Sequence, residues 1–268
     1  MPPNYSWAVL GISGGDPSFR DDDGSAEPGV TAALEAFAAC QGTERDVLTA
    51  LAGSRLLVPV VALLPDATAS DEPDTDEPRQ AGSREAGSRE AGSLQAGQGE
   101  KASEMALPTL IGLDGRRAIP AFTSQDSMRR WQADARPVPA AARQVWQAAT
   151  EDSCAVVIDV AGPVPLAVEG ARLAALARGE AVPAPCADPD VHEVVSDVLA
   201  GQLAIGAFEL RPGDAERDLI ISLTLAPGSG GYDVAGLAAD VGNAVMSRLG
   251  GRLRRGVAIW LGSSQPAG

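Results

Sequence analysis

The sequence is poor in the residues that usually build metal sites and thiol chemistry. Its 268 residues include one histidine, three cysteines and one lysine. A single histidine cannot supply a multi-histidine metal site, and Cys40, Cys154 and Cys186 lie far apart and match no ligand spacing. We therefore expect no metal and no cofactor, and three free thiols favour a reduced, cytoplasmic location.

Aromatic residues and long apolar runs are also scarce. Aromatics make up 4% of the chain against 45% hydrophobic residues, so any core is built from aliphatic side chains. The longest apolar run, residues 56–64, contains Pro59 and is too short to span a membrane. The apolar stretch at 7–12 is too short for a signal peptide. We expect no membrane partner.

The chain has a formal net charge of −15, and this charge is unevenly spread. Residues 1–29 hold five acidic and one basic residue, and residues 66–104 hold ten acidic and four basic residues. An acidic chain without a recognition motif argues against nucleic acid as a partner. These two segments carry most of the net negative charge, so the remaining chain is only mildly acidic.

Composition divides the chain into two expected domains. Residues 1–29 are expected to be a disordered tail, and residues 66–104 a disordered insert that contains the repeat AGSRE-AGSRE-AGSLQ-AGQGE. The predicted segments are a first domain at 30–178, a linker at 179–188, a C-terminal unit at 189–262 and a tail at 263–268.

Hydrophobic periodicity predicts an α+β fold, with two small mixed α/β units that contain mixed sheets. One helix should follow Thr43 as its N-cap, and another should begin at Thr123 and end before Pro137. The strand at 155–160 should be covered on both faces. Further helices are expected at 30–38, 140–150, 169–178, 191–199 and 232–249. Further strands are expected at 56–64, 107–113, 116–122, 203–210, 219–225 and 257–261.

Two patterns could suggest catalysis. Residues 11–15 (GISGG) match the G-x-S-x-G nucleophile elbow, but Asp16-Pro17 and an acidic coil follow where a helix is required, so a Gly-Ser coil is the better interpretation. His192 falls in the first turn of a predicted helix and is expected to be partly exposed. We predict no catalytic residue, and the balance leans against an enzyme.

Two other patterns could bind a ligand or a partner. The glycine-rich turn at 228–231 can point backbone N–H groups at an anion. Asp233 would repel a phosphate, however, and a tight connection between strand and helix is the better interpretation. Arg248, Arg252, Arg254 and Arg255 could complement a helix dipole, or could bind an acidic partner or the acidic tails. The candidate contacts are Gly230, Gly231, Asp233, Arg252, Arg254 and Arg255.

The stretch 107–131 (LPTLIGLDGRRAIPAFTSQDSMRRW) combines a strand, an Asp-Gly hairpin, a strand ending in Ala-Phe-Thr-Ser and a helix with a tryptophan. It resembles the N-terminal domain of the SseB family, the enhanced serine sensitivity proteins. Residues 55–60 (RLLVPV) and 157–163 (VIDVAGP) resemble other strands of that domain. Residues 189–261 resemble, less specifically, the C-terminal part of actinobacterial members. The resemblance implies an association with serine sensitivity but carries no catalytic residues.

These features favour a non-catalytic module that binds a protein or a small metabolite. The alternative is an enzyme or an amino-acid-binding regulator, with a pocket between the two units near 228–233 and 114–126. A deep pocket with convergent polar groups would favour the alternative, and a flat exposed apolar patch would favour a protein-binding module.

Overall fold

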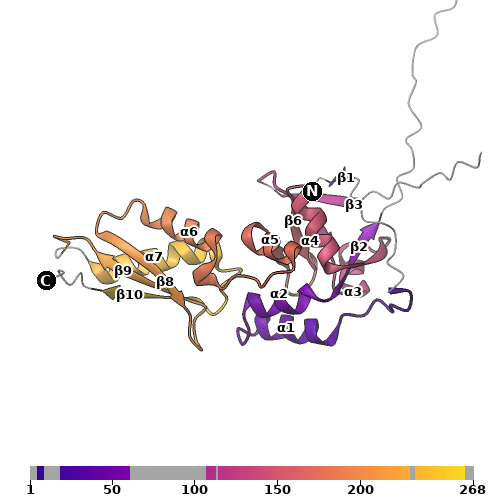
Figure 1. The fold of residues 1–268 in the computed structure, drawn as a ribbon, viewed down its shortest axis with the longest axis horizontal. Coiled ribbons are helices and arrows are strands. Elements are labelled where there is room, and N and C mark those ends of the chain that lie inside the picture. Colours follow the sequence, from indigo (N-terminus) through magenta and orange to yellow (C-terminus); the bar gives the residue numbers. More distant parts are fainter. Residues whose placement is uncertain (1–4, 9–18, 61–106, 113, 230–232, 263–268) are drawn as a thin grey trace, which may run out of the picture.

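The computed structural model describes residues 5–8, 19–60, 107–112, 114–229 and 233–262. The chain is α+β with mixed sheets, as expected from the sequence. Buried hydrophobic side chains form two clusters within residues 30–182 and a third within 191–253. These clusters define an N-terminal unit (19–182) and a C-terminal unit (185–262), which lie end to end in Figure 1. The predicted insert at 66–104 lies outside the described residues.

A five-stranded sheet forms the centre of the N-terminal unit, with the strand order β1-β3-β4-β6-β7. The Asp114-Gly115 turn joins β3 to β4 as an antiparallel hairpin, which confirms the turn signal. Strands β4 and β6 are the parallel neighbours in this sheet, so their carboxyl ends meet at one edge. The strands are β1 (Tyr5–Ala8), β3 (Leu107–Ile111), β4 (Arg117–Ala121), β6 (Ala155–Ile158) and β7 (Leu166–Val168).

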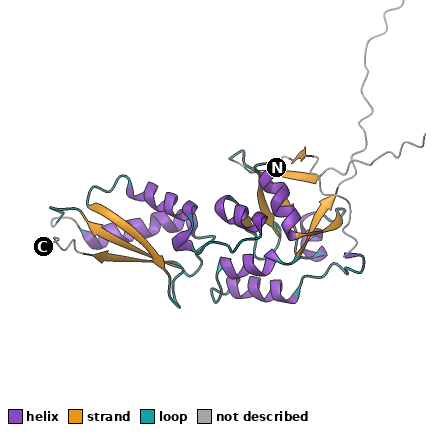
Figure 2. Ribbon diagram, in the orientation of Figure 1, coloured by secondary structure: helices purple, strands orange, loops and turns teal. Residues whose placement is uncertain are grey.

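Helices cover one face of this sheet (Figure 2). Trp146 and Phe37 are fully buried there, and each such side chain stabilises the fold by about 1.5–3 kcal/mol. The expectation that 155–160 is covered on both faces was wrong, because Ala155 and Val157 are only half-buried on the opposite face. The helices of this unit are α1 (Pro28–Ala38), α2 (Glu44–Ala52), α3 (Gln125–Trp131), α4 (Ala142–Glu151) and α5 (Gly170–Arg178).

A two-stranded antiparallel ribbon, β2 (Arg55–Val60) with β5 (Arg136–Ala141), lies beside the sheet. An isolated bridge between Leu57 and Phe122 connects it to the segment after β4. The sequence interpretation treated the prolines at 137 and 139 only as helix breakers and missed β5. Proline is tolerated here because the ribbon has free edges where no ladder hydrogen bond is needed.

The segment expected to be a disordered tail, residues 1–29, is in part ordered. Tyr5–Ala8 pair with β3, and α1 begins at Pro28. Between them, Asp22 forms an ion pair with Arg55, whose guanidinium is buried, and the backbone N–H of Gln125 donates to the carbonyl of Gly24. The acidic run at 21–23 therefore carries one residue that neutralises a buried cation.

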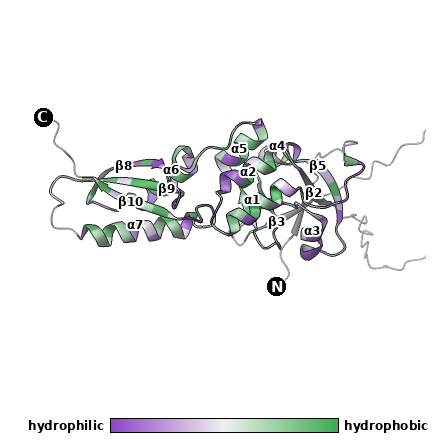
Figure 3. Cartoon of the chain, turned by 90° about the horizontal axis from the view of Figure 1, so that it is seen from below, coloured by the Kyte–Doolittle hydropathy of each residue, from purple (hydrophilic) through white to green (hydrophobic). Residues whose placement is uncertain are grey.

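The C-terminal unit is a three-stranded sheet, ordered β10-β9-β8, with two helices packed on one face. Leu219, Ile221 and Leu223 alternate along β9 and are buried against these helices, as the period-two pattern predicted. Hydrophobic residues dominate β9 and β10 (Figure 3). The elements are α6 (Pro189–Leu199), β8 (Ile205–Pro212), β9 (Leu219–Leu225), α7 (Val234–Leu249) and β10 (Val257–Gly262).

A group of four charged side chains, three of them buried and Arg252 half-buried, joins the two units. Arg252, just beyond α7, donates to Glu44 of α2 at 3.2 Å and also to Asp188, which precedes α6. Arg172 of α5 pairs with Glu44 from the other side. Burial raises the pKa of the Glu44 carboxyl and lowers the pKa of Arg172, although the opposite charges act against both shifts. The two negative and two positive charges therefore compensate one another at the junction.

Candidate functional site

The most developed polar site lies where the parallel strands β4 and β6 end. Thr123 follows β4 and Asp159 follows β6, and both side chains are buried. The Asp159 carboxylate accepts a hydrogen bond from the backbone N–H of Thr123 at 2.9 Å and from the Thr123 hydroxyl at 2.6 Å. Ligands of parallel sheets commonly bind outside the carboxyl ends of the strands, so this edge is a physically favoured place for a site.

Asp159 has a backbone φ of 48°, in the left-handed region that side-chain-bearing residues seldom adopt. The turn is held by a hydrogen bond of 2.6 Å from the N–H of Gly162 to the Asp159 carbonyl. A Cβ at position 162 would lie 2.9 Å from the Cβ and the carbonyl oxygen of Asp159, so only glycine fits. The surrounding contacts therefore hold a strained residue in place at this edge.

Ser124, not the expected Thr123, is the N-cap of α3. The Ser124 hydroxyl accepts from the backbone N–H of Ser127 at 3.1 Å. This shift of one residue leaves Thr123 before the helix, where its hydroxyl reaches Asp159. The error follows from the ambiguity of a Thr-Ser pair, because either hydroxyl can cap a helix.

Arg55 holds the backbone of Thr123 in position. Its side chain is buried at the start of β2 and donates at 2.6 Å to the backbone carbonyl of Thr123. The same guanidinium pairs with Asp22, while the backbone N–H of Arg55 donates to Glu27 at 3.1 Å. The position of Thr123 is thus fixed from two sides, by Asp159 and by Arg55.

A cavity of about 310 Å³ opens beside Asp159. Glu35 of α1 and Arg130 of α3 bring charges of opposite sign to its wall, and neither forms an ion pair among the described residues. Hydroxyl groups and a few small apolar side chains complete the wall. The lining residues are Ala26, Thr31, Leu34, Glu35, Ala38, Thr123, Ser124, Ser127, Arg130, Asp159, Pro163 and Val164.

Burial raises the pKa of the Asp159 carboxyl above its ordinary value. The hydrogen bonds from Thr123 and Ser127, and more weakly the charge of Arg130, act in the opposite direction. The cavity therefore presents a carboxyl group whose charge costs free energy when no cation is near. A cationic ligand group beside Asp159 would reduce that cost.

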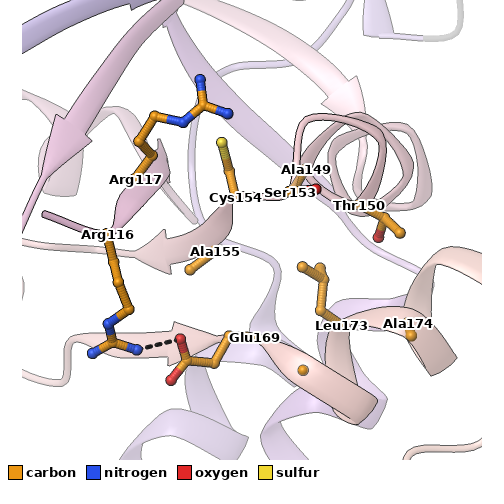
Figure 4. A pocket seen from close by; sticks show the side chains of 11 residues that line it. Arg116, Arg117, Ala149, Thr150, Ser153, Cys154, Ala155, Glu169, Leu173 and Ala174 are labelled. Atoms are coloured by element: carbon orange, nitrogen blue, oxygen red, sulfur yellow. Dashed lines mark hydrogen bonds and ion pairs between the residues drawn. The ribbon is translucent and has the colours of Figure 1, made fainter.

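A second cavity, of about 320 Å³, lies at the other end of the same strands (Figure 4). Arg116 pairs with Glu169 at 2.6 Å across it, and Arg117 donates to the backbone carbonyl of Asp152. Burial raises the pKa of Cys154 in its wall, which disfavours the thiolate. This cavity offers charge but no activated nucleophile.

An apolar groove of about 640 Å³ follows the open face of the five-stranded sheet. Half-buried and exposed side chains, among them Ile111 and Val157, form its floor, and Trp131 of α3 closes one side. Arg116 and Glu169 stand between this groove and the second cavity. The alternation along β6 leaves this sheet face partly open.

Comparison with models of protein families identifies the family of this chain. The family model of the SseB protein N-terminal domain matches residues 30–175. The chain belongs to the SseB family. The match begins within α1, ends within α5 and includes Arg55, Thr123 and Asp159 of the polar site. No protein with a curated description and no solved structure matches this SseB-family chain.

The glycine-rich turn of the SseB-family chain is only partly described. Gly230 and Gly231 lie outside the described residues. Asp233 accepts a hydrogen bond at 3.0 Å from the backbone N–H of Gly236 and is the N-cap of α7. The three cavities described above are lined by residues between Ala26 and Ala174, so none of these three joins 228–233 to 114–126.

The three arginines that were predicted to contact a ligand or a partner contact other residues of this chain. Arg252 pairs with Glu44 and Asp188 at the junction. The Arg254 guanidinium lies 4.6 Å from the ring centre of Phe37, and Arg255 pairs with Asp218 at 2.8 Å. The acidic partners of Arg252 and Arg255 belong to the folded units rather than to the tails.

The remaining predicted candidates show no catalytic arrangement in the described residues. His192 is exposed on α6, with its ring 5.0 Å from that of Phe208. The G-x-S-x-G pattern at 11–15 lies outside the described residues. Within the described part of the chain, no group of His, Cys, Asp and Glu could hold a metal ion, and no helix is long and apolar enough to cross a membrane.

Sequence reasoning missed Asp159, Thr123, Arg130 and Glu35 as a group. The quoted stretches AFTS and VIDVAGP contain two of them, but they were interpreted as packing and turn residues. A usable signal was present, because each stretch places a polar residue next to the end of a predicted strand. Their meeting depends on the parallel pairing of β4 and β6, which spacing along the chain does not reveal.

Proposed function

We propose that this SseB-family protein is a non-catalytic binding module, and that its ligand is a small zwitterionic metabolite of the α-amino acid class. The supporting observation is that Glu35 and Arg130, which lack ion-pair partners among the described residues, flank the buried Asp159 in one cavity of about 310 Å³. That volume is at the lower end for ligand pockets and suits a small molecule.

The charges suggest how such a ligand would lie. The α-ammonium group would face Asp159 and Glu35, and the α-carboxylate would face Arg130. The hydroxyl groups of Thr31, Ser124 and Ser127 could hydrogen-bond a polar side chain. Serine is the first amino acid to test, because the family resemblance implies an association with serine sensitivity.

The fixed contact between Thr123 and Asp159 supports binding rather than catalysis. The hydroxyl of Thr123 donates to Asp159, but the same carboxylate also accepts from the Thr123 backbone, so the pair forms a rigid structural contact. An activated hydroxyl would need a base that is free to take its proton, and both carboxylate oxygens of Asp159 already accept hydrogen bonds from Thr123.

The test compares serine with two analogues that each lack one charge. Ethanolamine lacks the carboxylate and glycolate lacks the ammonium group. Serine should raise the thermal unfolding temperature of the full chain, and each analogue should raise it less at the same concentration. The proposal fails if none of the twenty amino acids stabilises the protein.

A matched pair of variants locates the effect. Arg130→Gln removes the cation that lines the cavity, and should weaken serine binding at least about tenfold. Arg129→Gln removes the neighbouring cation, which pairs with Asp126 at 3.9 Å and does not line the cavity. Serine should bind Arg129→Gln and the natural protein equally well.

A second candidate function, protein binding, is favoured by the open apolar groove of about 640 Å³. Exposed apolar surface of this kind commonly marks a protein interaction site. Val157→Asp would place a charge on the groove floor. If the groove binds a protein, this variant should lose a partner that affinity capture recovers with the natural chain and with Leu203→Asp.

A further inference from the structure

A feature independent of the proposed ligand site is the free edge of the C-terminal sheet. Strand β10 is the outermost strand in the order β10-β9-β8, and it pairs only with β9 among the described residues. Its sequence, VAIWLG, contains no charged residue and no proline. An unprotected edge strand presents backbone donors and acceptors that readily pair with another strand.

The opposite edge of the same sheet is protected. Strand β8 carries Glu209, Arg211 and Pro212, and the two charged side chains form an ion pair at 2.9 Å. Its register with β9 is also irregular between Ile205 and Ala207. Charges, proline and bulges are the features that prevent edge-to-edge pairing. The sheet therefore blocks one edge and leaves the other available.

Exposed apolar side chains coincide with the unprotected edge. Trp260 is 53% exposed and Leu261 is 42% exposed, and they are consecutive residues of β10. Trp260 lies opposite Ser222 on the sheet face away from α6 and α7, and Leu261 lies opposite Leu223 on the helix-covered face. Both faces of the strand would therefore gain burial if another strand paired with it.

We propose that β10 pairs antiparallel with β10 of a second copy, and so joins two C-terminal sheets into one six-stranded sheet. A two-fold axis at Trp260 would place the two Trp260 side chains next to each other on one face. It would also place Ile259 of each copy opposite Leu261 of the other. Residues 258–262 of each copy then supply both sides of the interface, as a two-fold dimer requires.

The charge of the chain favours this surface for self-association. Two copies with a net charge of −15 each repel one another. Contact through β10 adds the least repulsion, because this strand has no charged residue. The dimer should therefore become tighter as salt screens the repulsion. A strand pair with its flanking side chains buries less than about 1,200 Å², so the dissociation constant should be micromolar.

The primary test is analytical ultracentrifugation of the full chain over a range of micromolar concentrations, at low and moderate salt. A monomer–dimer equilibrium that tightens with salt is expected. Trp260→Glu places two like charges side by side at the two-fold axis and should weaken the dimer at least about tenfold. Leu203→Glu makes the same change at an 86% exposed loop residue and should leave the dimer unchanged.

Hydrogen exchange of the natural chain provides a readout that does not depend on any variant. Amides of residues 257–262 should exchange more slowly as the protein concentration rises, while those of β8 should not change. A monomer at all concentrations would overturn the proposal. So would a dimer that survives Trp260→Glu and leaves exchange in β10 unchanged. The unfolding temperature of Trp260→Glu shows whether that variant is folded.

Discussion

The hydroxyl of Thr123 donates a 2.6 Å hydrogen bond to the carboxylate of Asp159, and this contact joins the end of β4 to the end of β6. The two residues are 36 positions apart, and both are buried. The contact forms one wall of the cavity that Glu35 and Arg130 complete. The stability of this contact therefore determines the shape of the proposed ligand site.

Thr123→Val keeps the shape of the side chain but removes the donor. One carboxylate oxygen of Asp159 then loses its partner in a buried place, so the free energy of unfolding should fall by about 1–3 kcal/mol. Urea denaturation measures this change. Thr49→Val is the matched control, because the Thr49 hydroxyl donates to the carbonyl of Arg45 on an exposed helix face, and its effect should be within about 0.5 kcal/mol.

Asp159 should give the protein a specific pH dependence. Because burial raises the pKa of Asp159 in the folded state, its contribution to stability is fully present below its unfolded pKa of 3.8 and is lost as pH rises through the folded pKa. Asp159→Asn does not titrate. The stability of the natural protein relative to Asp159→Asn should fall as the pH rises above 3.8, the ordinary pKa of this carboxyl group. Parallel thermal unfolding curves measure this, and a pH-independent difference would contradict the assignment.

Gly162→Ala tests the turn that holds Asp159. The added Cβ would lie 2.9 Å from atoms of Asp159, so the turn must move and stability should fall by about 1–3 kcal/mol. Gly29→Ala, in α1, meets nothing within 4 Å and should stabilise by up to about 1 kcal/mol. Chemical denaturation compares them, and equal effects would show that the turn is not constrained.

Arg252→Gln tests the buried junction. Glu44 and Asp188 would lose a shared cation inside the protein, so the free energy of unfolding should fall by about 3 kcal/mol. Arg248→Gln removes a surface pair with Asp197 at 3.4 Å and should cost less than about 1 kcal/mol. Limited proteolysis between the units should become faster only in Arg252→Gln.

Helix caps, tight turns and single helices and strands were predicted well, because the residues that determine them lie close together in the sequence. Thr43 caps α2 through a complete capping box with Asp46, and Asp114-Gly115 forms the expected hairpin. The helix at 234–249 and the strands at 219–225 and 257–262 follow their apolar periods. In each case the deciding residues are a few positions apart, so the chain itself carries the information.

The candidate site and the charged junction between the two units were not predicted, because tertiary structure brings their parts together. Arg252 was recognised as part of a basic cluster, but its partners Glu44 and Asp188 are 208 and 64 residues away. Asp22 belongs to a run of acids typical of a solvated tail, and only the burial of Arg55 distinguishes it. Charge patterns along a sequence do not reveal such pairings.

The most direct test of the proposed site is an NMR titration of the full chain with serine. The amide signals of Thr123, Ser124 and Ser127 should shift in a saturable manner, while those of β9 in the C-terminal unit should not. In Arg130→Gln the same signals should shift only at higher serine concentrations. Unchanged signals at 123–127 with millimolar serine, or shifts confined to other parts of the chain, would contradict the account.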